Sequence, residues 1–220
     1  MPNHTELITH MGAIGDIHAE DITLDQVLTF LSKQSLDRIV SVGDIVTGPG
    51  DVDRCRELLQ AHQVMTVAGN HDRWFSNGTM PTLPDATDPA SVSDQTKNFL
   101  KGLPQTVELR SPQGLVLICH GLGTNDMADL KPEDYGYAIE ANLDLQELIR
   151  SRQYRFVING HTHSRMVRHF EGLTVINVGT LRSYVSPGFA KIDFEARQVH
   201  FFDIRTGGKI VQADSIDLDG

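Results

Sequence analysis

Cysteine is scarce in this 220-residue chain, which contains Cys55, Cys119 and no others. One lies in a predicted helix and the other in a predicted strand, and we expect both to be reduced core residues rather than a disulfide. The sequence also lacks an apolar run of transmembrane length and a basic-then-apolar N-terminal signal. These absences predict a cytoplasmic location and no membrane partner.

Basic residues are also few, with 19 Lys and Arg against 29 Asp and Glu, for a formal net charge of −10. A broad nucleic-acid interface needs clustered cations, so nucleic acid is an unlikely partner. Hydrophobic residues make up 40% of the chain, which is ordinary for a globular protein. We expect a single domain over 1–220, and the charge balance fits a small phosphorylated substrate held mainly by metal better than duplex DNA.

The first third of the chain alternates apolar runs with helical patterns. Three runs are predicted strands: 7–14, 37–42 and 64–68. Apolar residues at helical spacing fill both intervals, and Thr23 with Gln26 forms a capping-box pattern before the first. This β-α-β-α-β order implies parallel strands joined by right-handed crossovers.

Two irregular excursions follow, at about 75–100 and 121–142. The first is rich in proline and small polar residues, and it is either a lid facing the substrate or a disordered spacer. A hairpin is predicted over 107–119 and a helix over 143–150. A strand is predicted over 154–158. From 165 on, the predicted strands 166–170, 173–176, 188–194 and 198–204 give a β-rich, antiparallel C-terminal third.

Five short Gly-flanked strings carry the chemistry, and most of them directly follow a predicted strand. They are G-D-I-H at 15–18, G-D at 43–44, G-N-H-D at 69–72, H-G at 120–121 and G-H-T-H at 160–163. Any one of these histidines alone is better explained as an ordinary turn residue. Five strings in order, at the carboxyl ends of strands, instead indicate a metal site. The candidate residues are Asp16, His18, Asp44, Asn70, His71, Asp72, His120, His161 and His163.

The spacing of these residues suggests how they could share metal ions. Asp-x-His places Asp16 and His18 on one side of an extended segment, and His161 and His163 repeat that spacing. Asp44 has two carboxylate oxygens and can bridge two ions. The oxygen and nitrogen donors suit two divalent ions, Mn, Fe or Zn, with Mn favoured. Two such ions can hold a hydroxide and clamp a phosphoryl group.

The ordered strings resemble the calcineurin-like metallophosphoesterase superfamily. Asn177–Thr180 is similar to the N-x-G-[ST] loop of its small bacterial and archaeal phosphodiesterase-like members. The resemblance implies an α/β fold, a four-layer α/β/β/α sandwich with two mixed sheets. It implies one metal on Asp16, His18, Asp44 and His163, and another on Asp44, Asn70, His120 and His161. It also implies that His71 assists the leaving group and that Asp72 orients His71.

The predicted function is hydrolysis of small phosphate diesters or monoesters by in-line attack of a metal-bridging hydroxide. Residues 43–50 lack the arginine of the protein Ser/Thr phosphatase branch, which disfavours phosphoprotein substrates. Two alternatives stay open: an interaction scaffold that has lost catalysis, and a nuclease of the same superfamily. Arg73, Trp74 and Arg182 are either rim contacts to the substrate or local anchors. Native metal, substrate and oligomeric state are left open.

Overall fold

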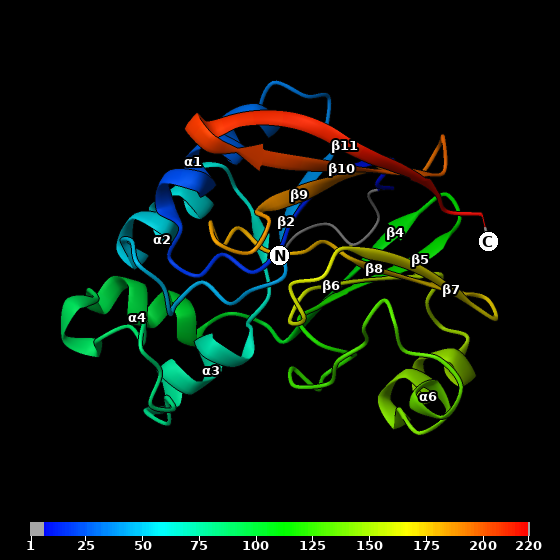
Figure 1. The fold of residues 1–220 in the computed structure, drawn as a ribbon, viewed down its shortest axis with the longest axis horizontal. Helices are drawn as coiled ribbons and strands as arrows, with labels where there is room; N and C mark the ends of the chain where they lie inside the picture. Colours follow the sequence, from blue (N-terminus) through cyan, green and yellow to red (C-terminus); the bar gives the residue numbers. More distant parts are fainter. Residues whose placement is uncertain (1–6, 220) are drawn as a thin grey trace.

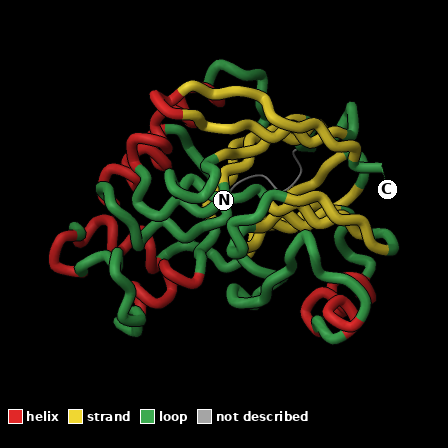
Figure 2. The backbone as a smooth tube through the Cα atoms, viewed as in Figure 1, coloured by secondary structure: helices red, strands yellow, loops and turns green. Residues whose placement is uncertain are grey.

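The computed structural model describes residues 7–219, and its strands form two mixed sheets (Figure 1, Figure 2). The first sheet has the order β11-β10-β9-β1-β2-β3. Its strands are β1 (His10–Ile14), β2 (Arg38–Ser41), β3 (Met65–Thr66), β9 (Gly188–Asp193), β10 (Gln198–Arg205) and β11 (Lys209–Asp217). The first three pair in parallel, as the β-α-β-α-β pattern predicts, and β9 joins β1 antiparallel.

The second sheet has the order β4-β5-β6-β8-β7. Its strands are β4 (Thr106–Ser111), β5 (Gly114–Cys119), β6 (Phe156–Asn159), β7 (Met166–Phe170) and β8 (Leu173–Asn177). The predicted hairpin is confirmed as the antiparallel β4–β5 pair, while β5, β6 and β8 run parallel. The second sheet therefore has parallel central strands and antiparallel edges, whereas the first is parallel from β1 to β3 and antiparallel from β1 to β11.

Helices cover the outer face of each sheet, with α1 to α4 on one side and α6 on the other (Figure 1). Their bounds are α1 (Asp21–Leu31), α2 (Val52–Ala61), α3 (Asn70–Asn77), α4 (Asp94–Lys101), α5 (Tyr137–Glu140) and α6 (Leu143–Ser151). Two short 3-10 turns occur at Pro89–Ser91 and Thr206–Gly208. In α1 the residues at helical spacing, Leu24, Val27, Leu28 and Leu31, are all buried.

Alternating side chains of the strands build separate cores on the two faces of each sheet. In β5, Val116 and Ile118 face the first sheet, whereas Leu117 and Cys119 pack with Leu145 of α6. Neighbouring residues of a strand point to opposite faces, so one apolar run serves two cores. A third cluster joins α1 and α2 to the first sheet. These three cores separate four layers, which confirms the predicted α/β/β/α sandwich.

Several local predictions need correction. The helix α1 begins at Asp21 with Glu20 as N-cap and no side-chain capping bond, so the capping box at Thr23 is wrong. The helix already starts two residues earlier, so Thr23 lies inside its first turn. The irregular excursions are shorter than expected, because α3 continues to Asn77, α4 starts at Asp94 and α5 lies within 121–142. The strand β11 follows the last predicted strand and was missed.

The structure bears on the expectations about the two cysteines and about membrane-spanning helices. Cys55 and Cys119 are free and buried, which confirms their assignment to the core. Within residues 7–219, none of the helices has the length and apolar character needed to span a membrane.

Candidate metal centre

Seven side chains of the metal prediction meet where the carboxyl ends of the two sheets adjoin. Three follow strands of the first sheet: Asp16 after β1, Asp44 after β2 and Asn70 after β3. Three follow the second sheet: His120 after β5, and His161 and His163 after β6. Parallel strands of one sheet end at one edge, so residues distant in sequence converge there. His18 completes the group.

Four of these residues have a left-handed rather than an extended backbone conformation, and this sets the direction of their side chains. The φ angles are 49° at His18, 49° at Asp44, 68° at His161 and 58° at His163. Residues with a Cβ adopt this conformation at a cost, and such residues concentrate at functional sites. The expectation that Asp-x-His and His-x-His lie on extended segments is therefore wrong, although Asp16 and His18 still converge.

Glycines before the ligands leave room for the carboxylates. A Cβ on Gly69 would lie 2.1 Å from Asp44 Oδ1, and a Cβ on Gly160 would lie 2.2 Å from Asp16 Oδ1. Both distances are far below a van der Waals contact. Glycine is thus required at positions 69 and 160 by the close approach of backbone to carboxylate.

The first donor cluster consists of Asp16, His18 and His163. His163 Nε2 lies 3.0 Å from Asp16 Oδ2 and 3.0 Å from His18 Nε2. His18 Nδ1 donates to the Thr47 carbonyl at 3.0 Å, which leaves Nε2 with its lone pair toward the cluster. Asp16 Oδ2 is buried, and its close neighbour is His163 Nε2. One carboxylate oxygen and two imidazole nitrogens therefore lie within 4.8 Å of one another, a donor set that fits a bound cation.

The second donor cluster consists of Asn70, His120 and His161. Asn70 Oδ1 lies 2.9 Å from His120 Nε2 and 3.0 Å from His161 Nδ1. His120 Nδ1 donates to the Val42 carbonyl at 2.7 Å, so its Nε2 is also directed into the site. One amide oxygen and two imidazole nitrogens therefore face one point.

Asp44 connects the two clusters. Its Oδ2 lies 3.8 Å from His18 Nε2 in the first cluster and 3.3 Å from His120 Nε2 in the second. Its Oδ1 accepts the backbone N–H of His71 at 2.9 Å. The side chain is almost fully buried. This placement is the one required of a shared carboxylate, and it could not be deduced from the spacing of the strings alone.

The electrostatics of the two clusters favour added positive charge. Burial raises the pKa of Asp44 and Asp16, but the neighbouring histidines outweigh it and hold both values below the ordinary range. Burial lowers the pKa of His120, and the Asp44 and Asp16 carboxylates overcome this and raise it to about 10. A buried anionic pair thus attracts a cation. Burial lowers the pKa of His18 to about 4, which keeps that imidazole neutral for coordination.

His71 lies beside both clusters without joining either. Its Nε2 is 3.9 Å from Asp44 Oδ2, and its ring packs edge-on against His18 with 5.0 Å between centroids. Trp74 covers the His71 ring at the same centroid distance, which assigns Trp74 a contact that the sequence left undecided. Burial lowers the pKa of His71. Its Nδ1 is buried and has no hydrogen-bond partner within residues 7–219.

Asp72 does not orient His71, which corrects the expectation from the resemblance. Its Oδ1 accepts the N–H groups of Ile45 at 2.8 Å and Val46 at 3.3 Å, and its Oδ2 accepts that of Gly69 at 3.0 Å. Asp72 occupies the third position of α3, where a carboxylate caps the helix N-terminus. Its role here is to fix the loop after Asp44. Burial and the Asp44 carboxylate raise the pKa of Asp72 to about 7, although the three N–H groups act to lower it.

Arg182 reaches the site from the loop after β8. Its Nη2 donates to the Thr47 carbonyl at 3.2 Å and lies 3.1 Å from His18 Nδ1, and its Nη1 donates to Asp85 Oδ2 at 2.8 Å. Thr180 Oγ1 donates to the Asp16 carbonyl at 2.9 Å. The contact with Asp85 crosses nearly 100 residues of sequence, and no motif in the chain signals it.

Sequence comparison identifies the fold family. A model of the calcineurin-like phosphoesterase superfamily domain matches residues 10–197. The chain belongs to this superfamily. Its members generally use divalent metals, and the two donor clusters occupy the matching segment. The resemblance read from the five strings is thereby confirmed.

Individual relatives are distant. The protein MJ0912 of Methanocaldococcus jannaschii, described as uncharacterized, is 24% identical over 181 residues, or 78% of this chain and 69% of its own length. A metallophosphoesterase structure from Sphaerobacter thermophilus has a TM-score of 0.63 at 21% identity, covering 90% of this chain and 88% of the other. Vacuolar Protein Sorting 29 from Cryptosporidium parvum has a TM-score of 0.57 at 18% identity, covering 96% and 100%. These structural likenesses support the fold.

Proposed function

We propose that this protein is a binuclear metal-dependent phosphoesterase that hydrolyses small phosphodiesters, with phosphomonoesters as second substrates. The observation that carries the proposal is the pair of donor clusters joined by Asp44, which lies 3.8 Å from His18 Nε2 and 3.3 Å from His120 Nε2. A closed structural site needs one ion, whereas two clusters sharing a carboxylate suit catalysis. Membership of a phosphoesterase superfamily supports the same reading.

The residues expected to hold the ions follow from the contacts. Asp16, His18 and His163 would hold one ion, Asn70, His120 and His161 would hold the other, and Asp44 would be shared between them. Divalent ions bound here supply Lewis acidity for a phosphoryl group and for activation of water. Mn is our favoured metal, with Fe or Zn as the alternatives, because the donors are nitrogen and oxygen without thiolate.

We assign two further roles to side chains near the clusters. They select the charge of the substrate, and they assist departure of the leaving group. Arg73 is paired with Asp126, and Arg182 with Asp85, so carboxylates already neutralise both arginines near the clusters. Little free positive charge remains to balance the second negative charge of a phosphomonoester, which favours diesters. We assign assistance of the leaving group to His71, whose Nε2 lies 3.9 Å from Asp44 Oδ2 beside both donor clusters.

The proposal is tested by hydrolysis of bis(4-nitrophenyl) phosphate and 4-nitrophenyl phosphate by protein supplied with Mn²⁺, Fe²⁺ or Zn²⁺. We expect metal-dependent turnover that is faster on the diester and is lost on adding a chelator. Asp44→Asn removes the shared carboxylate and is expected to abolish turnover. A matched control, Asp25→Asn, changes an exposed carboxylate on α1. Equal rates for wild type, Asp44→Asn and His71→Ala contradict the proposal.

An interaction scaffold remains the second candidate, because the fold also resembles a protein named for vacuolar sorting. Metal content separates the two. A scaffold that has lost catalysis retains well under one divalent ion per chain after incubation with Mn²⁺. The intact donor clusters favour the enzyme.

A further inference from the structure

Residues 80–87, hereafter the strap, lie in the first irregular excursion, between α3 and α4, and contact the loop after Asp44 at Thr47. Thr47 donates its backbone N–H to Thr87 Oγ1 at 2.9 Å, and its Oγ1 lies 3.7 Å from Met80 Sδ. Thr47 is fully buried. The strap is therefore packed onto the loop that carries Asp44.

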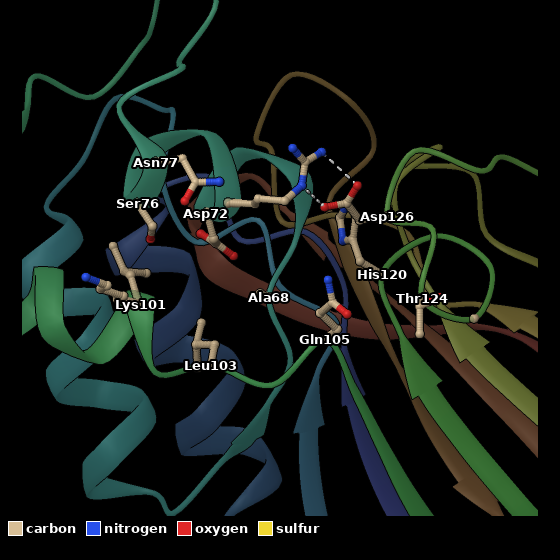
Figure 3. Close-up of a pocket in the computed structure, with 13 residues that line it drawn as sticks. Ala68, Asp72, Ser76, Asn77, Lys101, Leu103, Gln105, His120, Thr124 and Asp126 are labelled. Atoms are coloured by element: carbon tan, nitrogen blue, oxygen red, sulfur yellow. Dashed lines mark hydrogen bonds and ion pairs between the residues drawn. The ribbon is translucent and has the colours of Figure 1, made fainter.

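Thr47 has an unusual backbone conformation for its residue type. Its φ angle is 69°, in the left-handed region that β-branched residues seldom adopt. Such a conformation persists only where the surroundings hold it. Asp72 on α3 (Figure 3) accepts the N–H groups of Ile45 and Val46, and Thr87 of the strap accepts that of Thr47. Three consecutive N–H groups of the loop are thus fixed by side chains from outside it.

The conformation held in this way directs two carbonyl groups at His18. The Val46 and Thr47 oxygens lie 3.3 Å and 3.0 Å from His18 Nδ1. The Val46 carbonyl and the Thr47 N–H belong to one planar peptide unit, so the bond to Thr87 also fixes the Val46 oxygen. Because these acceptors hold its proton on Nδ1, His18 presents the lone pair of Nε2 to the first donor cluster.

Arg182 connects the strap to the same acceptor. Its Nη2 donates to the Thr47 carbonyl at 3.2 Å, and its Nη1 donates to Asp85 Oδ2 at 2.8 Å. Since His18 Nδ1 donates to this carbonyl as well, the 3.1 Å between Nη2 and Nδ1 reflects two donors that share one acceptor. Asp85 of the strap therefore acts through Arg182 on the Thr47 carbonyl.

We propose that Thr47 is a positioning residue of the metal centre and that the strap holds it in place through Thr87 and Asp85. The Thr47 and Val46 carbonyls fix the tautomer and ring orientation of His18, the residue that would bind the ion. The inference rests on the proposed function, since it takes His18 as a ligand of the first ion. It goes further by making the first excursion part of the metal-binding structure.

The variant Thr87→Val tests the inference, because it keeps the shape of the side chain and removes the acceptor of the Thr47 N–H. Calorimetric titration of the metal-free protein with Mn²⁺ measures the Kd of each ion, and His163→Ala identifies the ion of the first cluster. Loss of a ligand's direct hydrogen-bond partner costs about 10–100-fold in metal affinity, and Thr87 acts one step further away. We therefore expect Thr87→Val to weaken the first ion by on the order of threefold to tenfold and to leave the other within about twofold. The visible spectrum of the Co²⁺-loaded protein is expected to change as well, since it depends on ligand geometry.

Three further variants separate positioning from a purely structural role. Thr87→Ser keeps the hydroxyl group and is expected to retain the wild-type Kd. Asp85→Asn weakens the Arg182 contact and is expected to weaken the same ion, so it decides the question if Thr87→Val does not fold. Thr82→Val makes the same substitution at an exposed threonine of the strap and is expected to have no effect.

The possible outcomes separate the inference from the proposed function. Lower melting temperatures with unchanged Kd values in Thr87→Val and Asp85→Asn would make the strap purely structural and overturn the inference. The proposed function then stands if the wild type binds two ions and hydrolyses the diester. Equal weakening of both ions also overturns the inference, since His18 belongs to the first cluster. Failure of the wild type to bind Mn²⁺ overturns both.

Discussion

Asp72 provides the sharpest test of how the site is held together. The carboxylate is buried and accepts three backbone N–H groups, two of them from the residues that directly follow Asp44. Asp72→Ala leaves three buried donors without an acceptor. Each such donor costs about 1–3 kcal/mol, and the longest bond costs least, so we expect the free energy of unfolding to fall by about 3–5 kcal/mol.

Asp72→Asn is a milder change, because one oxygen is retained and one donor faces an NH₂ group. We expect a loss of about 1–2 kcal/mol for this variant. Urea denaturation of the metal-free proteins, followed by circular dichroism, measures both values. A loss of about 3–5 kcal/mol lowers the urea midpoint by about 1–2 M for a typical dependence on denaturant.

The kinetic consequence separates this role from orientation of His71. If Asp72 fixes the loop after Asp44, Asp72→Asn weakens Mn²⁺ binding, and its effect on kcat adds to that of His71→Ala. If Asp72 oriented His71, the double variant would be no slower than His71→Ala alone. Wild-type stability and Mn²⁺ affinity in Asp72→Asn, together with such non-additivity, would refute the reasoning.

Three other changes have defined outcomes. Gly160→Ala places a Cβ 2.2 Å from Asp16 Oδ1 and is expected to reduce bound Mn by about half or more, measured by elemental analysis; full metal content would contradict the steric argument. His71→Ala is expected to lower kcat by on the order of 100-fold, most for poor leaving groups, with Mn content unchanged; a uniform effect on all leaving groups would remove its acid role. At Asp37, burial raises the pKa, but hydrogen bonds from Thr9 and His10 outweigh it and lower the value below 3.8, so this carboxylate stabilises the fold above that pH. Asp37→Asn should therefore be less stable than wild type at pH 7, with the difference shrinking as pH falls below about 4 in thermal melts; a difference independent of pH would exclude the linkage.

Most strands and helices were predicted from the residues, because apolar periodicity is a local signal, whereas the four layers followed from the resemblance carried by the five strings. Val116 to Cys119 alternate between two cores, and apolar residues at helical spacing bury one face of α1. The β11 strand was missed because its side chains are mostly exposed and show no apolar alternation. The start of α3 at Asn70 was missed because its cap is the side chain of Asp72, within the metal string itself.

The sequence predicted which residues form the site better than it predicted how they are arranged. Five ordered strings identified the residues that converge. The left-handed backbone at His18 and Asp44 could not be inferred, since nothing in the residue types requires it. Contacts such as Arg182 with Asp85 depend on packing between segments far apart in sequence, and no periodic pattern encodes them. The sequence also could not show that Asp72 fixes the loop after Asp44 instead of orienting His71, because this contact too joins segments far apart in sequence.

The measurement that tests the central claim most directly is the number of divalent ions bound per chain. Wild type and Asp44→Asn are loaded with Mn²⁺, freed of unbound metal by gel filtration and analysed by inductively coupled plasma mass spectrometry. Two donor clusters joined by Asp44 predict about two ions per wild-type chain and fewer than one in Asp44→Asn. Well under one ion per wild-type chain, or the same content in both proteins, would contradict the binuclear centre.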